Sequence, residues 1–383
     1  MMDLWLDEEQ EALRQTVEDF ARKEVAPVIG GFYEREEFPY DLVAKMGRMG
    51  LFGLPVDEDH GGMGGDYTAL CIALEELGRV DSSVAITLEA GVSLGLMPIY
   101  RFGTDEQKAR WLPDLVTATK LGAFGLTEPG GGSDAGATRT TARLDGDEWV
   151  INGSKSFITN SGTDVTSLVT VTAITGERDG GKKEISAIIV PSGTPGFSVA
   201  PKYSKVGWNA SDTHELSFDD CRVPAENLLG ERGRGYAQFL SILDEGRIAI
   251  AALGTGLAQG CVDESVRYAH EREAFGQPIG SYQAIQFKIA EMETRAHTSR
   301  LAWYAAAAKM QAGKPFKKEA AIAKLVSSNA AMDNARDATQ IFGGYGFMNE
   351  FPVGRFYRDA KILEIGEGTS EVQKMLIARQ LGL

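Results

Sequence analysis

The chain contains few of the residues that form disulfides, metal sites or catalytic triads. It has only 3 cysteines and 4 histidines among 383 residues. Cys71, Cys221 and Cys261 lie far apart and are odd in number, so we expect neither a disulfide framework nor a metal site. The scattered histidines show no pairing with a nucleophile. Isolated thiols suit a reducing compartment and predict a cytoplasmic protein.

The chain also has little positive charge and no long apolar run. Its 39 Lys and Arg against 54 Asp and Glu give a net charge of -15, which disfavours nonspecific binding to nucleic acid. No apolar run approaches the roughly 20 residues that cross a bilayer, so we expect no membrane span. The N-terminus has neither a signal-peptide nor a transit-peptide pattern. The mitochondrial matrix stays an alternative location only for a processed eukaryotic chain.

Apolar spacing predicts helices in the first part of the chain. Residues 13–25 carry apolar side chains at helical intervals, and we expect Pro27 to end this helix. Residues 104–107 form a predicted capping box, and Pro113 should keep the following helix short. The length of the chain suggests two or three domains, of which residues 1–121 form the first.

The pattern changes to short β-rich runs after Gly122 and returns to long helices after Gly230. Gly, Asp and Pro separate the runs, which predicts an antiparallel sheet or barrel over residues 122–229 and makes a Rossmann fold unlikely. Residues 230–383 are predicted to form a helical bundle. The predicted strands are 149–151, 156–159, 167–173, 185–190 and 215–218, and the predicted helices are 235–270, 282–312, 317–342 and 369–381.

A glycine-rich segment, GAFGLTEPGGGSD, covers residues 122–134. Glycines let backbone amides approach a flat or anionic ligand, and Thr127 and Ser133 can add side-chain hydrogen bonds. The segment lacks the lysine of a P-loop and the spacing of a dinucleotide fingerprint. Taken alone, it is equally compatible with an interdomain turn that binds nothing.

A second segment, residues 340–373, places Gly366, Glu367 and Gly368 directly before a predicted helix. A carboxylate between two glycines is exposed by its backbone. The alternative is an acidic residue that only stabilises a helix N-terminus.

Together, these two segments resemble the two signature regions of the acyl-CoA dehydrogenase family, and of its short-chain and short/branched-chain members most. LDEGR at 243–247 and EREAFGQPIGSYQAIQ at 271–286 extend the resemblance over essentially the whole chain. The resemblance implies an α+β multidomain fold with an N-terminal all-α domain, a central antiparallel β-barrel and a C-terminal four-helix bundle. It also implies a homotetramer with one FAD per subunit.

The resemblance further implies oxidation of a saturated short- or medium-chain acyl-CoA, straight or branched, to the trans-2-enoyl-CoA in fatty acid β-oxidation. Glu367 matches the base that removes the α-proton while hydride leaves the β-carbon for flavin N5, and electrons pass to electron-transferring flavoprotein. The Glu367 amide and the flavin ribityl 2′-hydroxyl would form the oxyanion hole. Some relatives carry the base where this chain has Gly246, and Glu245 would point about 100° away on a helix.

The matching positions also imply which residues contact FAD and substrate. Phe157 could instead be a barrel-core aromatic, Arg272 a surface partner of Glu271 or Glu273, and Asp244 with Arg247 a buried salt bridge. The implied FAD contacts are Phe124, Leu126, Thr127, Gly132, Ser133, Phe157, Ile158 and Thr159 at the isoalloxazine ring; Arg272, Phe275, Gln283, Gln340, Gly343 and Gly344 at the diphosphate and adenine end, often across a subunit interface; and Thr369, Ser370 and Glu371 on the last helix. The implied substrate contacts are Ser133, Asp244, Arg247 and Gly368.

Two other functions remain open at this point. A flavin-dependent acyl-CoA or nitroalkane-type oxidase would share the fold and the flavin motifs but transfer electrons to oxygen. A flavin-free helical interaction protein would share only the helical pattern. The net negative charge disfavours the DNA-associated branch of the family.

Overall fold

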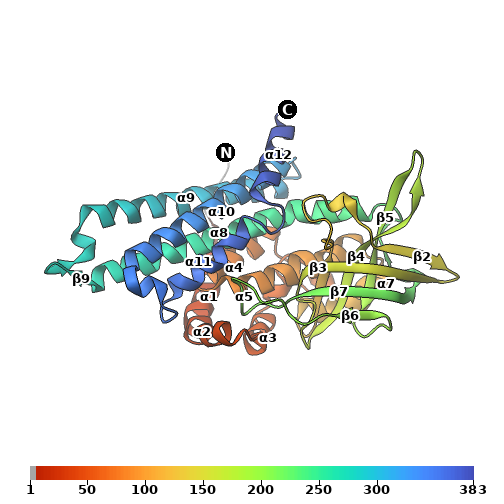
Figure 1. Ribbon diagram of the computed structural model, residues 1–383, viewed down its shortest axis with the longest axis horizontal. Helices are drawn as coiled ribbons and strands as arrows, with labels where there is room; N and C mark the ends of the chain where they lie inside the picture. Colours follow the sequence, from red (N-terminus) through yellow and green to blue (C-terminus); the bar gives the residue numbers. More distant parts are fainter. Residues whose placement is uncertain (1–5) are drawn as a thin grey trace.

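The computed structural model describes residues 6–383, so the first five residues of the predicted N-terminal domain lie outside the described part. Helices come first, strands follow, and long helices complete the chain (Figure 1). This is the order that the sequence pattern predicts, and the predicted fold class is confirmed. The first helices are α1 (Glu8–Phe20), α2 (Ala26–Arg35), α3 (Tyr40–Arg48), α4 (Tyr67–Gly78), α5 (Ser82–Glu89), α6 (Met97–Phe102) and α7 (Asp105–Val116).

Two prolines affect the N-terminal helices less than expected. The helix does not end at Pro27, because a π-helical turn, η1 (Ala21–Val25), connects α1 to α2 and places Pro27 in the first turn of α2. A first-turn proline loses no intrahelical hydrogen bond. Thr104 caps α7 through the predicted capping box, and α7 continues three residues past Pro113 to Val116.

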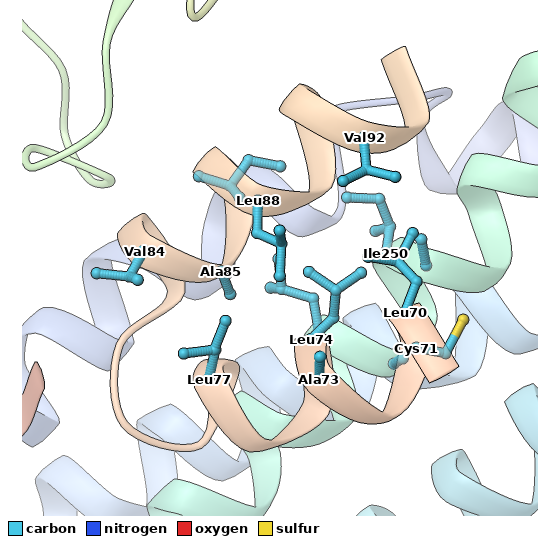
Figure 2. Packing of buried hydrophobic residues seen from close by; sticks show 14 of the residues in the cluster. Leu70, Cys71, Ala73, Leu74, Leu77, Val84, Ala85, Leu88, Val92 and Ile250 are labelled. Carbon is cyan, nitrogen blue, oxygen red and sulfur yellow. The ribbon is translucent and has the colours of Figure 1, made fainter. Parts of the chain in front are cut away.

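One apolar stretch corrects the expectation that no run approaches membrane length. The continuous helical segment Ser82–Phe102 has 21 residues. Its most apolar window of 18 residues has a mean hydropathy of 1.4, but 94% of that window is buried inside the protein. It comprises α5, the π-helical η4 (Ala90–Leu96) and α6. In Figure 2, Leu88 and Val92 of this segment lie near Leu74 of α4 and Ile250 of α8 (Gly235–Glu271). Such burial is typical of a core helix.

The middle part is an eight-stranded sheet in the order β6-β7-β3-β2-β4-β5-β8, with β1 paired to β4. Most pairings are antiparallel, as predicted, but β1 and β2 pair in parallel with β4. The predicted runs 149–151 and 156–159 belong to one strand, β3, whose register shifts between Lys155 and Ile158. The strands are β1 (Leu121–Gly125), β2 (Thr141–Asp145), β3 (Glu148–Thr159), β4 (Thr166–Arg178), β5 (Lys182–Pro191), β6 (Phe197–Val199), β7 (Thr213–Pro224) and β8 (Leu228–Leu229).

The C-terminal part is a bundle in which α10 packs against α8, α9, α11 and α12. Every predicted helix here is present, with ends within two residues of the expected ones. A short hairpin of β9 (Glu273–Ala274) and β10 (Gln277–Pro278) joins α8 to α9. The remaining helices are α9 (Gln283–Gln311), α10 (Lys317–Phe342), α11 (Pro352–Leu363) and α12 (Ser370–Gln380).

A single buried carboxylate, Asp359 of α11, connects all three parts of the fold. Its Oδ1 accepts hydrogen bonds from the Tyr33 hydroxyl at 2.6 Å and the Trp208 amide at 2.7 Å. Its Oδ2 accepts one from the Ser82 hydroxyl at 2.8 Å. Burial, with Asp81 nearby, raises the pKa of Asp359 to about 6. The carboxylate therefore joins α2, α5 and the segment before β7 to the helix that leads to Glu367.

Replacing Asp359 by alanine should destabilise the whole chain. The Asp359→Ala variant leaves three buried or partly buried donors without this acceptor, so the free energy of unfolding should fall by about 3 kcal/mol or more. Urea denaturation measures this loss. The matched control is Asp333→Ala, which removes an exposed ion pair with Arg336 and should change stability little. Equal losses in the two variants would contradict the role of Asp359.

Candidate active site

Glu367 lies in a tight turn between α11 and α12. The backbone φ is 51° at Glu367 and 96° at Gly368, and the Ser370 amide closes the turn on the Glu364 carbonyl at 3.0 Å. A left-handed conformation is unusual for glutamate, and such strain is found most often at functional sites. The residue is only half-buried as a whole, but its Oε2 atom is buried and has no hydrogen-bond partner within residues 6–383.

Gly246 of α8 makes room for the Glu367 carboxylate. A Cβ atom at Gly246 would lie 2.6 Å from Oε2 of Glu367, closer than two such atoms can approach. Glu245, one residue earlier, instead pairs with Arg101 at 3.3 Å. The two positions that the sequence offers for a base, 246 and 367, therefore meet at one point in space, and only Glu367 supplies a carboxylate there.

A second carboxyl group, Glu89, faces Glu367 inside the protein. Glu89 is fully buried at the end of α5. A Cβ atom at Gly246 would lie 3.7 Å from its Oε1 and 2.6 Å from Oε2 of Glu367, so the two carboxyl groups are neighbours. Neither Glu89 oxygen has a hydrogen-bond partner within residues 6–383. Burial raises the pKa of both groups, that of Glu89 far above its usual range, and two adjacent buried carboxyls do not both ionise. Burial and the charge of Glu367 therefore both disfavour ionisation of Glu89.

Two buried cations oppose the effect of burial on Glu367. Arg247 of α8 and Lys324 of α10 each favour the ionised carboxylate and lower its pKa, although burial is the larger effect. Arg247 also forms an ion pair with Asp244, which Lys317 contacts at 3.1 Å. The salt bridge considered from the sequence is thus present, but the Arg247 Nε atom remains buried without a partner within residues 6–383.

The sequence analysis did not identify Glu89 or Lys324. The available signal was a charged residue directly after, or within, a run of apolar or small residues. Glu89 interrupts the apolar stretch Ser82–Phe102, and Lys324 follows Ala320, Ala321 and Ala323. Because the partners come from distant helices, only the fold shows what these charges face.

The glycine-rich loop after β1 is fixed against β3. The Ser156 amide donates to the Thr127 carbonyl at 2.8 Å. Glu128 forms a buried ion pair with Lys155 at 2.7 Å and also accepts the Arg139 amide. Sequence analysis missed this pair, which places Thr127 beside the end of β3. The loop residues Gly132 and Ser133 are exposed.

The end of β3 presents an aromatic ring to solvent. Phe157 has φ 62° at the register shift of β3 and is 66% exposed, so it is not part of the barrel core. Ile158 is buried, whereas Thr159 is half-buried. Phe124 of β1 and Leu126 of the following loop are buried, and Phe124 stacks on Phe239 of α8 with centroids 3.9 Å apart.

One side chain brings this region next to the paired carboxyls. Asn160, directly after β3, donates to the Thr87 carbonyl of α5 at 3.1 Å, two residues before Glu89. This hydrogen bond fixes the end of β3, which carries Phe157 and Thr159, to the helix that carries Glu89.

A separate pocket of about 480 Å³ lies at the far end of α8, and Arg272, Gly343 and Gly344 are among the residues that line it. The Arg272 guanidinium lies over the Tyr345 ring at 5.9 Å, while Glu271 pairs with Arg267. A Cβ at either glycine would meet no atom within 4 Å, so this backbone is open to a ligand. A guanidinium beside open backbone suits a diphosphate.

The structure does not bring all predicted FAD contacts to one place. Gly246 and Arg272 are separated by about 40 Å along α8 at 1.5 Å per residue. Phe275 is 97% exposed at the tip of the β9–β10 hairpin, and Gln283 and Gln340 are also exposed near this end. These residues cannot reach a ligand that also contacts Phe157.

The predicted residues of the last helix lie next to the Glu367 turn. Thr369 is the N-cap of α12 and accepts the Val372 amide at 3.3 Å. The Ser370 hydroxyl is buried without a partner within residues 6–383, and Glu371 is exposed. Their side chains thus flank the turn.

Comparison with known proteins assigns the family. The acyl-CoA dehydrogenase N-terminal, middle and C-terminal domain profiles match residues 7–119, 123–221 and 233–382. The chain is 50% identical to a probable acyl-CoA dehydrogenase of Bacillus subtilis over 99% of this chain and 100% of that one. It is 46% identical to the mitochondrial short-chain specific acyl-CoA dehydrogenase of Rattus norvegicus, covering 98% and 90% of the two chains.

Solved structures agree with this assignment. Butyryl-CoA dehydrogenase from Megasphaera elsdenii superposes with a TM-score of 0.96 at 43% identity over 100% of both chains. A chain in a structure described as the electron transferring flavoprotein of Acidaminococcus fermentans gives a TM-score of 0.95 at 43% identity over 99% of both. The chain therefore belongs to the acyl-CoA dehydrogenase family and is an FAD-dependent oxidoreductase of the short-chain type.

Proposed function

We propose that this protein oxidises a saturated short- or medium-chain acyl-CoA to the trans-2-enoyl-CoA, as a step of fatty acid β-oxidation, with Glu367 as the base. The observation that carries this proposal is the buried, unpartnered Oε2 of Glu367 in the space that Gly246 leaves open. The short-chain relative and the butyryl-CoA dehydrogenase structure support the substrate class.

The surroundings of Glu367 suit the removal of an α-proton. Burial raises its pKa, which makes the carboxylate a stronger base, while Arg247 and Lys324 keep it ionised. The Glu367 amide makes no hydrogen bond within residues 6–383. It is therefore available to donate to the thioester oxygen, where charge develops as the proton leaves. Asp244 and Ser133 are proposed to contact the coenzyme A portion, as the family match implies.

FAD, when bound, supplies the hydride acceptor. Its ring fits the exposed Phe157 face beside Thr127 and Thr159. Its adenine and diphosphate end fits the Arg272 pocket with Gly343 and Gly344. Because about 40 Å of α8 separates the two regions, they belong to two different cofactors. We therefore propose a homo-oligomer, a tetramer as in the family, in which the Arg272 pocket of one subunit receives FAD held by another.

The proposed electron acceptor is an electron-transferring flavoprotein. Support comes from the similar chain in the Acidaminococcus fermentans structure described by that name. Rapid turnover with oxygen that yields stoichiometric hydrogen peroxide would contradict this acceptor and favour an oxidase. The bacterial relative supports a cytoplasmic location.

The Glu367→Gln variant tests the base directly. It keeps the size and polarity of the side chain but cannot accept the α-proton. FAD and acyl-CoA should still bind, while flavin reduction slows by a factor of about 10² or more. The measurement is anaerobic loss of flavin absorbance on mixing with butyryl-CoA. Glu245→Gln, which affects only the pair with Arg101, is the control and should have a much smaller effect. Near-normal reduction by Glu367→Gln would refute the proposed function.

The Gly246→Ala variant tests the space around the base. Its Cβ would collide with Oε2 of Glu367 and displace the carboxylate, so flavin reduction should slow by roughly 10² while FAD content stays normal. Gly254→Ala on the same helix is the matched control, because its Cβ meets its nearest atom, the Ser327 Oγ, at 3.3 Å. If the two variants react equally fast, the proposed site geometry is wrong.

A further inference from the structure

Lys324 is a fully buried lysine in the first half of α10. Its Nζ donates to the Gly368 carbonyl at 2.8 Å, directly after Glu367. Burial lowers the pKa of Lys324 to about 8, and the nearby charged groups are Glu367, Arg247, Glu364 and Glu371. An apolar side chain of similar volume is often at least as stable at a buried position as an ion. Stability alone therefore does not account for a lysine at this position.

The turn that Lys324 contacts needs support from outside. Glu367 and Gly368 both have positive φ, and the turn has few bonds of its own. Gln373 of α12 donates to the same Gly368 carbonyl at 2.9 Å. Ser328, four residues after Lys324, donates to the Leu363 carbonyl of α11 at 2.8 Å. Helices α10 and α12 thus hold the turn from two sides.

The charge of Lys324 also acts on the base. The groups that face Glu367 are Glu89 of α5, Arg247 of α8 and Lys324 of α10. Lys324 and Arg247 are the cations among them, and each favours the ionised form of Glu367. Arg247 is already paired with Asp244, whereas Lys324 reaches the turn itself.

We propose that Lys324 is a positioning residue for the reaction: it holds the Glu367 turn through the Gly368 carbonyl and keeps the carboxylate ionised through its charge. This inference rests on the proposed role of Glu367. It assigns to α10 a part in proton abstraction that the residues matching the family motifs do not include.

The test compares Lys324→Met, Lys324→Arg and the control Ser327→Ala in the FAD-loaded protein. Ser327 is buried on the same helix, and its hydroxyl donates only to the Lys324 carbonyl within residues 6–383. The first readout is the rate of anaerobic flavin reduction by butyryl-CoA as a function of pH and substrate concentration. The second is hydrogen exchange of the amides of residues 366–371, which does not depend on activity.

In Lys324→Met, loss of the positive charge should raise the pKa of Glu367. At a pH below its pKa, a carboxylate loses about tenfold of its ionised fraction for each unit by which its pKa rises. The maximal rate at neutral pH should therefore fall about tenfold and recover as the pH rises. The half-saturating butyryl-CoA concentration should change much less, and amides 366–371 should exchange faster. Lys324→Arg should restore the pH profile of the unchanged protein, and Ser327→Ala should keep both its profile and its exchange rates.

A pH profile and exchange rates for Lys324→Met that equal those of Ser327→Ala would overturn the inference. If Lys324→Met does not fold, Lys324→Gln replaces it with the same expected shift of the pH profile. The result for Glu367→Gln separates the two proposals. Normal reduction by Glu367→Gln refutes the function itself, whereas a slow Glu367→Gln beside an unaffected Lys324→Met refutes only the role of Lys324.

Discussion

The structure depends on one constraint: the Glu367 carboxylate must be buried and still remain reactive. Burial of a lone carboxylate is unfavourable, and a group without support becomes neutral. Four residues act on Glu367 together: Gly246 leaves space for the carboxylate, Glu89 lies buried beside it, and Arg247 and Lys324 supply positive charge. They come from three helices, α5, α8 and α10, so the base exists only in the assembled fold.

The same elements connect the base to the rest of the chain. Asp359 fixes α11 to α2, α5 and the segment before β7, and α11 leads directly to the Glu367 turn. Asn160 fixes the end of β3 to α5 two residues before Glu89. The end of β3 and the helix that carries Glu89 are therefore held together by a buried hydrogen bond between domains. Loss of stability and loss of activity should accompany each other at these connections.

Much of the fold follows from local patterns in the sequence. The helix Lys317–Phe342 begins and ends where the pattern predicts, because its apolar face and its flanking Gly and Pro are local signals. Glu367 was identified from a motif that matches a known family. A local signal failed at Pro27. This proline was expected to end a helix, but a π-helical turn connects α1 to α2, and Pro27 lies in the first turn of α2.

The buried charges could not be predicted, because their neighbours in space are distant in the sequence. Glu89 and Lys324 lie on separate helices, and each resembles an isolated polar residue until the fold brings it to Glu367. The motif match assigned Phe157 and Arg272 to opposite ends of FAD, often across a subunit interface, and about 40 Å of helix separates the positions of Gly246 and Arg272. The distance between these two positions can be calculated only once α8 is known to be one continuous helix.

The central claim is that an ionised carboxylate with a raised pKa removes the α-proton. The most direct measurement is the rate of anaerobic flavin reduction in the unchanged protein between about pH 5 and pH 9 with saturating butyryl-CoA. The account predicts a rate that rises with pH through an apparent pKa above the ordinary range of glutamate and then becomes constant. A rate that is independent of pH, or that falls as the pH rises, would contradict it.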